Sequence, residues 1–135
     1  MYEIIKYLCD YNNWGFTYAR TDFQNLYDME EIPFKPLIFL DPIQITEEFD
    51  EYNTVNKTNY NGSFMVLVSS DLDAIDYDTR YQNHIKPIID NTLETLKQGV
   101  KCDGKNSINS WRVIEVINVL DFNGDGVAVT FNIDG

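Results

Sequence analysis

The chain has few cations, few cysteines and no long apolar run, and each shortage excludes a class of protein. Its 135 residues include 10 Lys and Arg against 22 Asp and Glu, which gives a formal net charge of −12. Such a surface repels DNA, RNA and anionic lipid, because binding a polyanion requires cations that displace its counterions. No apolar run approaches the roughly 18 residues that cross a bilayer, and residues 1–15 lack the basic and apolar regions of a signal peptide. We therefore expect an intracellular protein that binds neither nucleic acid nor membrane.

The familiar catalytic and redox motifs are also missing. Cys9 and Cys102 lie far apart and belong to no Cys-x-x-Cys or Cys/His cluster, so we interpret them as free thiols. A disulfide would require their Cα atoms to lie within about 7 Å, and the sequence leaves that open. The motifs of zinc proteases, P-loop proteins and dinucleotide-binding proteins are absent. We expect no catalytic residues and no cofactor.

What is present predicts one α+β domain over residues 1–135, with a mostly antiparallel sheet packed against an N-terminal helix and one long central helix. Apolar residues make up 44% of the chain, enough for a normal core. Helical spacing predicts helices over residues 1–11 and 78–98. Alternating and short apolar runs predict strands over residues 14–19, 37–40, 43–52, 63–69, 111–120 and 127–133.

Local signals refine this framework. Residues 43–69 are expected to form a long antiparallel hairpin whose tip, residues 53–62, is a polar loop. Pro87 lies within the apolar stripe of the central helix and is expected to kink or split it. Gly99 is expected to end that helix.

Four aspartates and the single histidine are the remaining candidates for chemistry. The aspartates precede the central helix, where the helix dipole favours negative charge, and we expect them to be solvated caps; a metal site or an acid–base pair is the alternative. His84 is a candidate general base, but its place beside the apolar stripe favours a half-exposed helix residue. An enzyme would need a pocket that joins His84 to these aspartates. The four aspartates are Asp71, Asp73, Asp76 and Asp78.

Residues 121–126 read Asp-Phe-Asn-Gly-Asp-Gly and match the first half of a calcium loop. This stretch resembles the EF-hand and dockerin families over six residues only, in which Asp121, Asn123 and Asp125 would supply oxygen ligands. The second half of the motif is missing, because position twelve is Asn132 instead of a bidentate glutamate. We favour a turn between two strands, for which Asn, Gly and Asp are well suited, and keep calcium as the alternative.

Aromatic residues make up 14% of the chain, and several fall in segments predicted to be loop or surface. Tyrosine is favoured at protein contacts because it supplies area at low entropic cost. Packing in the core is the alternative for each of them. The residues in question are Phe23, Tyr27, Phe34, Tyr52, Tyr60 and Tyr77.

The order of elements resembles small neck and tail proteins of tailed bacteriophages, of the tail-terminator or tail-completion type. After an N-terminal helix come a proline-bounded apolar strand at residues 36–42 and a strand that leads into an acidic turn at residues 64–73. A long helix follows, with His-Ile-Lys-Pro-Ile at residues 84–88, and a hairpin at residues 121–127 closes the pattern. The resemblance covers most of the chain, most clearly residues 64–133.

The resemblance implies a structural virion protein without catalytic residues, assembled in the host cytoplasm. Such proteins form a ring, often a hexamer, that contacts the portal or connector and the tail tube. An acidic ring lets DNA pass without binding it, because like charges repel. The hairpin over residues 43–69 is expected to reach a neighbouring subunit and extend its sheet. The alternative function is a small acidic protein-binding module, with or without calcium at residues 121–126.

Overall fold

The computed structural model describes residues 1–19, 35–69, 76–102, 106–119 and 124–135. The strands are β1 (Gly15–Tyr18), β2 (Leu37–Leu40), β3 (Gln44–Phe49), β4 (Val55–Ser69), β5 (Ser107–Val119) and β6 (Gly124–Asp134). The helical segments are α1 (Tyr2–Asn12), α2 (Tyr77–Arg80), the π-helical segments η2 (Tyr81–Ile85) and η3 (Ile88–Leu93), and α3 (Glu94–Cys102).

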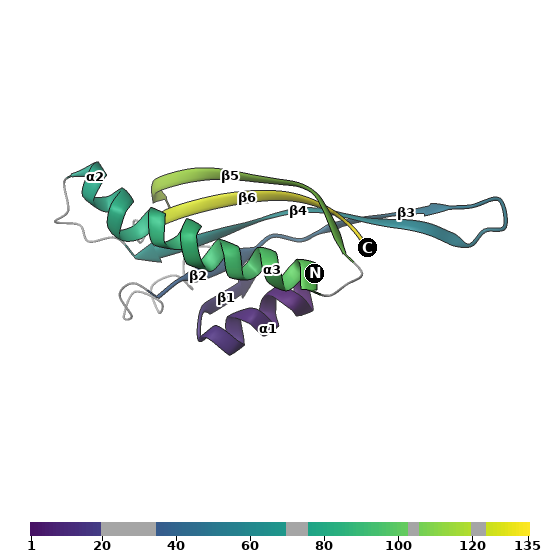
Figure 1. The fold of residues 1–135 in the computed structure, drawn as a ribbon, viewed down its shortest axis with the longest axis horizontal. Coiled ribbons are helices and arrows are strands. Elements are labelled where there is room, and N and C mark those ends of the chain that lie inside the picture. Colours follow the sequence, from purple (N-terminus) through teal and green to yellow (C-terminus); the bar gives the residue numbers. More distant parts are fainter. Residues whose placement is uncertain (20–34, 70–75, 103–105, 120–123) are drawn as a thin grey trace.

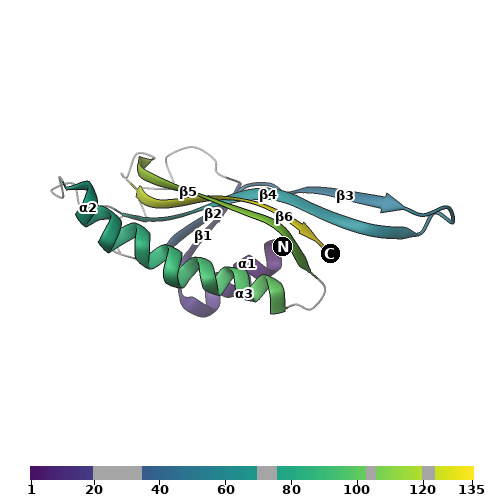
Figure 2. The ribbon, with the colours of Figure 1, turned by 45° about the horizontal axis from the view of Figure 1, so that its top comes forward.

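One six-stranded sheet forms a layer, and the helices lie on one of its faces (Figures 1 and 2). The strand order is β1-β2-β4-β6-β5, and β3 pairs with the part of β4 that extends beyond β2. Among the described strands only β1 and β2 run parallel; the other pairs are antiparallel. The predicted α+β fold, with its N-terminal helix, long central helix and mostly antiparallel sheet, is confirmed.

The central helix is continuous from Tyr77 to Cys102 and bends along its length (Figure 1). Pro87 has no N–H to donate, and the π-helical segments η2 and η3 flank it on both sides. In η2 the N–H of Lys86 reaches back to the carbonyl of Tyr81. The helix therefore bends around the proline instead of splitting there.

The two ends of the central helix differ in how well the sequence predicts them. At the start, the Asp76 carboxylate accepts the N–H of Asp78 at 3.0 Å, so the expected cap is confirmed for this aspartate. Asp71 and Asp73 lie outside the described residues. At the other end the prediction is wrong, because the helix runs through Gly99 to Cys102. A Cβ at Gly99 would overlap the Leu8 side chain of α1, so this glycine lets two helices approach closely.

The core fills the space between the helices and the sheet. Alternate residues of β4 and β6 point into it and meet the apolar stripe of the central helix, and each large side chain buried there contributes about 1.5–3 kcal/mol. A smaller cluster of Leu37, Phe39 and Leu67 lies on the opposite face of the sheet. The largest buried side chains of the main core are Ile5, Ile38, Leu40, Phe64, Val66, Ile85, Ile88, Leu96, Phe131 and Ile133.

The length of β4 is the main departure from the predicted elements. The composition of residues 53–62 favours a loop, but β4 begins at Val55 and only residues 50–54 form the turn. Residues 59–61 pair with β3 on one side and with β6 on the other. These backbone hydrogen bonds outweigh the low strand propensity of Asn and Gly.

The start of β6 also differs from the prediction. Gly124 already belongs to the strand, so Asp125 and Gly126 are strand residues instead of a turn. Gly126 lies opposite Leu67 of β4, and a Cβ placed on it would overlap the carbonyl oxygen of Val66. The glycine of the calcium-like motif is therefore explained by a close approach of two backbones.

We predict that Gly126→Ala destabilises the protein by about 1–3 kcal/mol or more, because a backbone carbonyl has no rotamer by which to move aside. Gly99→Ala is the control. Its new Cβ would meet the flexible end of Leu8, and alanine is favoured over glycine inside a helix by about 1 kcal/mol. Urea denaturation of both variants measures the difference. A Gly126→Ala midpoint equal to that of wild type would contradict the close approach.

Candidate functional site

A two-stranded hairpin arm extends from one end of the sheet, well beyond the helices (Figure 1). We define the arm as residues 44–58, which comprise β3, the turn and the first part of β4. Its turn is ordered by Asp50, whose carboxylate accepts the N–H groups of Tyr52 at 2.8 Å and Thr54 at 3.0 Å. Every residue of β3 is exposed. The predicted long hairpin is confirmed, with a shorter turn than expected.

The arm exposes apolar side chains that nothing in the described part of the chain covers. Ile45 is 59% exposed, Phe49 58% and Val55 44%. Ile45 pairs with Tyr60 and Phe49 pairs with Val55. Because cross-strand partners share a face and Tyr60 packs against the main core, these side chains continue the helix-covered face of the sheet beyond the helices.

The arm is also the most acidic short segment that the structure describes. Glu47, Glu48, Asp50 and Glu51 lie within five positions, and within the described residues no ion pair involves the three glutamates. Lys57 is the only cation of the arm, and its ammonium group lies 3.3 Å from the Asp134 carboxylate. The arm therefore presents apolar side chains bordered by unneutralised carboxylates.

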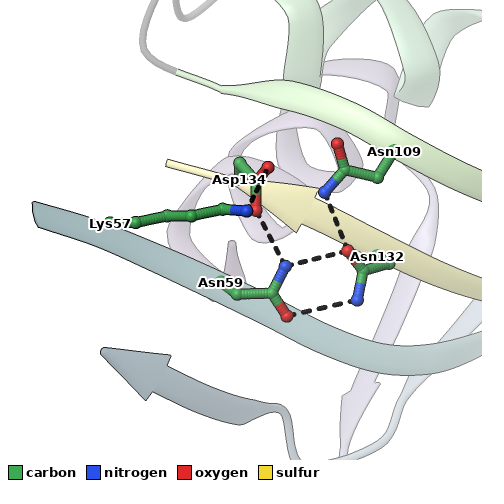
Figure 3. A network of polar contacts seen from close by, with 5 residues as sticks. All are labelled: Lys57, Asn59, Asn109, Asn132 and Asp134. Carbon is green, nitrogen blue, oxygen red and sulfur yellow. Dashed lines mark hydrogen bonds and ion pairs between the residues drawn. The ribbon is translucent and has the colours of Figure 1, made fainter. Parts of the chain in front are cut away.

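A network of polar side chains ties the base of the arm to β5 and β6 (Figure 3). Asn59 and Asn132 exchange two hydrogen bonds, of 2.8 and 3.1 Å, and Asn109 donates a third to Asn132 at 2.9 Å. Asn59 also donates to the Asp134 carboxylate at 2.9 Å. Beyond this network the N–H of Gly135 donates to the Thr58 carbonyl at 2.8 Å. Together these bonds fix the direction in which the arm leaves the sheet.

This network lowers the pKa of the Asp134 carboxyl group. The hydrogen bond from Asn59, followed by the nearby amide of Asn109 and the ammonium of Lys57, holds the pKa of Asp134 below its ordinary value. A depressed carboxyl pKa stabilises the folded state above the ordinary pKa, and this contribution is lost as the pH falls through the lowered value. The contribution of Asp134 to the base of the arm is therefore present at neutral pH.

A second polar cluster lies inside the body, where Asp125 of β6 meets the Arg80 and His84 side chains of the central helix. Arg80 Nε donates to Asp125 Oδ2 at 2.9 Å, and His84 Nδ1 lies 2.9 Å from the same oxygen. All three side chains are buried, with exposed fractions of 6%, 4% and 0% for Arg80, His84 and Asp125. Because a carboxylate only accepts hydrogen bonds, His84 carries a proton on Nδ1. This cluster joins the helix to β6, an inner strand of the sheet.

The buried cluster changes two interpretations based on sequence. His84 is buried, contrary to the expected half-exposed position, and within the described residues its carboxylate partner is Asp125 of β6. Asp76 and Asp78 are exposed. A histidine–aspartate pair enclosed in this way is out of reach of a substrate, so we interpret it as a structural contact between the central helix and β6. The sequence does contain a signal for this cluster, because Arg80 and His84 are four positions apart and so share one face of a helix.

The calcium-like motif is only partly described. Asp121 and Asn123 lie outside the described residues, while the Asp125 carboxylate is already bound by Arg80 and His84. Two hydrogen-bonding partners on one oxygen compete directly with a metal for that ligand. Within the described ranges, no group of three His, Cys, Asp or Glu side chains is arranged to hold a metal ion.

Both cysteines are free, as expected from the sequence. Cys9 is buried in the core, and its burial, helped by the neighbouring charge of Asp10, raises the pKa of its thiol to about 12. Cys102 is exposed at the end of α3. Of the aromatic residues expected at the surface, Tyr52 and Tyr77 are highly exposed and Tyr60 is half-buried. Phe23, Tyr27 and Phe34 lie outside the described residues.

Comparison of the sequence with protein-family models and with curated proteins finds no match. None of the helices in the described ranges is both long and apolar enough to cross a membrane. The arm and the buried cluster are therefore interpreted from their own geometry.

We predict that Asp125→Asn lowers the free energy of unfolding by about 3–5 kcal/mol, because it removes the buried charge that the Arg80 guanidinium contacts at 2.9 Å. Asp90→Asn removes the same charge from an exposed position of the central helix, and a change within about 0.5 kcal/mol is expected there. Chemical denaturation of both variants measures the difference. Equal effects of the two substitutions would show that the buried cluster contributes no more than a surface charge.

We predict that Asn59→Ala raises the pKa of Asp134 toward its ordinary value, because it removes the hydrogen bond that lowers this pKa most. The measurement is an NMR titration of the side-chain carboxyl carbons, read at Asp134. Asp90, for which exposure and distance from the arm predict no response, is the internal reference. An unchanged titration of Asp134 in the variant would remove Asn59 from the network.

Proposed function

We propose that this protein is a ring-forming structural component of a tailed-phage virion, acting as a tail terminator or head–tail joining protein. The observation that carries the proposal is the anchored arm, which leaves the body and exposes Ile45, Phe49 and Val55. Exposed apolar surface on a protruding element marks a site of protein contact. A protein whose most distinctive surface projects outward is suited to joining subunits.

An arm that reaches away from its own body makes a heterologous contact, in which two different surfaces of the same chain meet. Such contacts close into a ring when the rotation between neighbours divides a full turn. The network of Asn59, Asn132 and Asp134 supports this role, because it holds the arm at one angle. A fixed angle is what allows every subunit to repeat the same rotation.

The charge of the chain fits a ring through which DNA passes. With a formal net charge of −12, the protein repels a polyanion instead of binding it. The ring's partners in this proposal are further copies of the chain and the adjoining portal, connector or tail-tube proteins, in a virion assembled in the host cytoplasm. The protein acts by assembly and not by catalysis.

We predict that shortening the arm blocks assembly while the body still folds. Residues 47–58 are replaced by Asn-Gly, which closes a tight turn between the cross-strand partners Thr46 and Asn59. Wild type is expected to form closed rings in negative-stain electron microscopy and light scattering, and the shortened variant is expected to remain a monomer. The reason is that the variant loses Phe49, Tyr52 and Val55, which supply much of the exposed apolar area of the arm.

The control is the exposed substitution Tyr77→Ala, which removes a comparable aromatic ring from the far end of the molecule. Rings are expected to persist in this variant. Circular dichroism checks that the shortened variant keeps its fold. A wild-type protein that stays monomeric, alone and with connector or tube proteins, would contradict the proposed function and favour a monomeric binding module.

A further inference from the structure

The strand β5 forms one edge of the sheet, and nothing in the described part of the chain pairs with its outer side. Val113 is 37% exposed and Ile114 45%, and they point to opposite faces, since their partners are Val129 and Ala128. Exposed sheet edges usually carry lysine, proline or a short strand that prevents pairing with other chains. Residues 107–119 contain neither lysine nor proline, and the two register irregularities of β5 leave its middle part, residues 110–116, regular. This edge is therefore open to a further strand.

The strand β3, in contrast, belongs to a part of the sheet that a further strand would stabilise. Among the residues that the structure describes it pairs only with β4, so there most of the arm is a two-stranded ribbon. A two-stranded ribbon in water is marginally stable on its own, and a third strand is usually required. Its outer edge, over residues 44–49, is free to accept one.

The two edges cannot meet within one molecule. β4 and β6 lie between β3 and β5 in the sheet, and both views show the arm pointing away from the body (Figures 1 and 2). A second copy of the chain carries both edges and can supply each to the next. We propose that β3 of one copy pairs with the β5 edge of its neighbour, so that β5 is the surface that receives the arm.

Charge complementarity selects the direction and register of this pairing. In an antiparallel pair with Ile45 opposite Ile114, Glu47 lies opposite Arg112, and Gln44 lies opposite Glu115. Opposite charges then face each other and no like charges do, which favours the pair. Arg112 is exposed, and within the described residues it takes part in no ion pair. If the two strands ran parallel, with Ile45 still opposite Ile114, Glu47 would lie opposite Val116 and the pair of opposite charges would be lost.

The contact is heterologous, so each copy gives one edge and receives one, as a ring requires. It also covers the apolar side chain of Ile45, which the arm leaves exposed. This inference rests on the proposed function, because it names the surface to which the arm of a ring subunit binds.

Disulfide trapping tests the pairing directly. Ile45→Cys and Ile114→Cys are made separately in a Cys102→Ser background, which removes the exposed native thiol and leaves buried Cys9. Under mild oxidation the mixture is expected to form a linked dimer, and the double variant a ladder of linked oligomers. Ile45→Cys mixed with Tyr77→Cys is the control, since Tyr77 is exposed but belongs to α2 and not to the β5 edge.

Two results of this trapping experiment would overturn the inference. Linkage no stronger than in the Tyr77→Cys control would show that β5 does not receive the arm. Linkage of Ile114→Cys with itself would show that two β5 edges pair with each other. If wild type nevertheless forms rings that require the arm, the proposed function stands and only the receiving surface is wrong. If wild type forms no rings at all, the proposed function itself is wrong.

Charge reversal tests the register. Glu47→Arg alone and Arg112→Glu alone are each expected to weaken self-association up to about fivefold, and the double variant is expected to restore it. Sedimentation velocity measures the association. Thermal unfolding of the single variants checks that the body is unchanged. Weakening without rescue in the double variant would place the two side chains apart and overturn this register.

Discussion

The antiparallel ladder between β4 and β6 runs through the centre of the sheet, from the pair Asn59 and Asp134 to the pair Ser69 and Gly124. Its inward side chains form the middle of the core against the central helix. The approach of the two backbones at Gly126 leaves no room for a Cβ. One strand of this ladder, β4, continues beyond the sheet and becomes half of the arm. Body and arm are therefore built on the same pair of strands.

The two ends of this ladder hold the polar clusters of the molecule. At one end Asp125 is buried with Arg80 and His84, and a buried carboxylate is tolerated there because both partners satisfy it. At the other end the network around Asn132 lies at the root of the arm (Figure 3). The first cluster fixes the helix on the sheet, and the second fixes the arm on the sheet. The direction of the arm relative to the helices follows from both.

The arm combines surface properties that a soluble monomer seldom retains without use. Apolar side chains continue the core face into solvent, carboxylates border them, and the outer edge of β3 has no partner among the described residues. Burying that apolar area and completing the ribbon with a third strand both lower the free energy when another strand is added. In the proposed ring, the β5 edge of a neighbouring copy would provide such a strand. The proposed assembly would then depend on the stability of this one element.

The sequence by itself determined the α+β class, the first helix, the cores of most strands and the aspartate cap at the start of the central helix. Those features depend on local periodicity and on neighbouring residues, as the alternation of Val127, Val129 and Phe131 illustrates. It did not determine the length of β4, the continuation of the helix past Gly99 or the partners of His84 and Asp125. Residues 55–62 are polar and resemble a loop until strands distant in sequence supply their hydrogen bonds, and Gly99 resembles a helix end until Leu8 packs against it. Only the tertiary structure decides such positions, because the atoms that give each residue its role come from other parts of the chain.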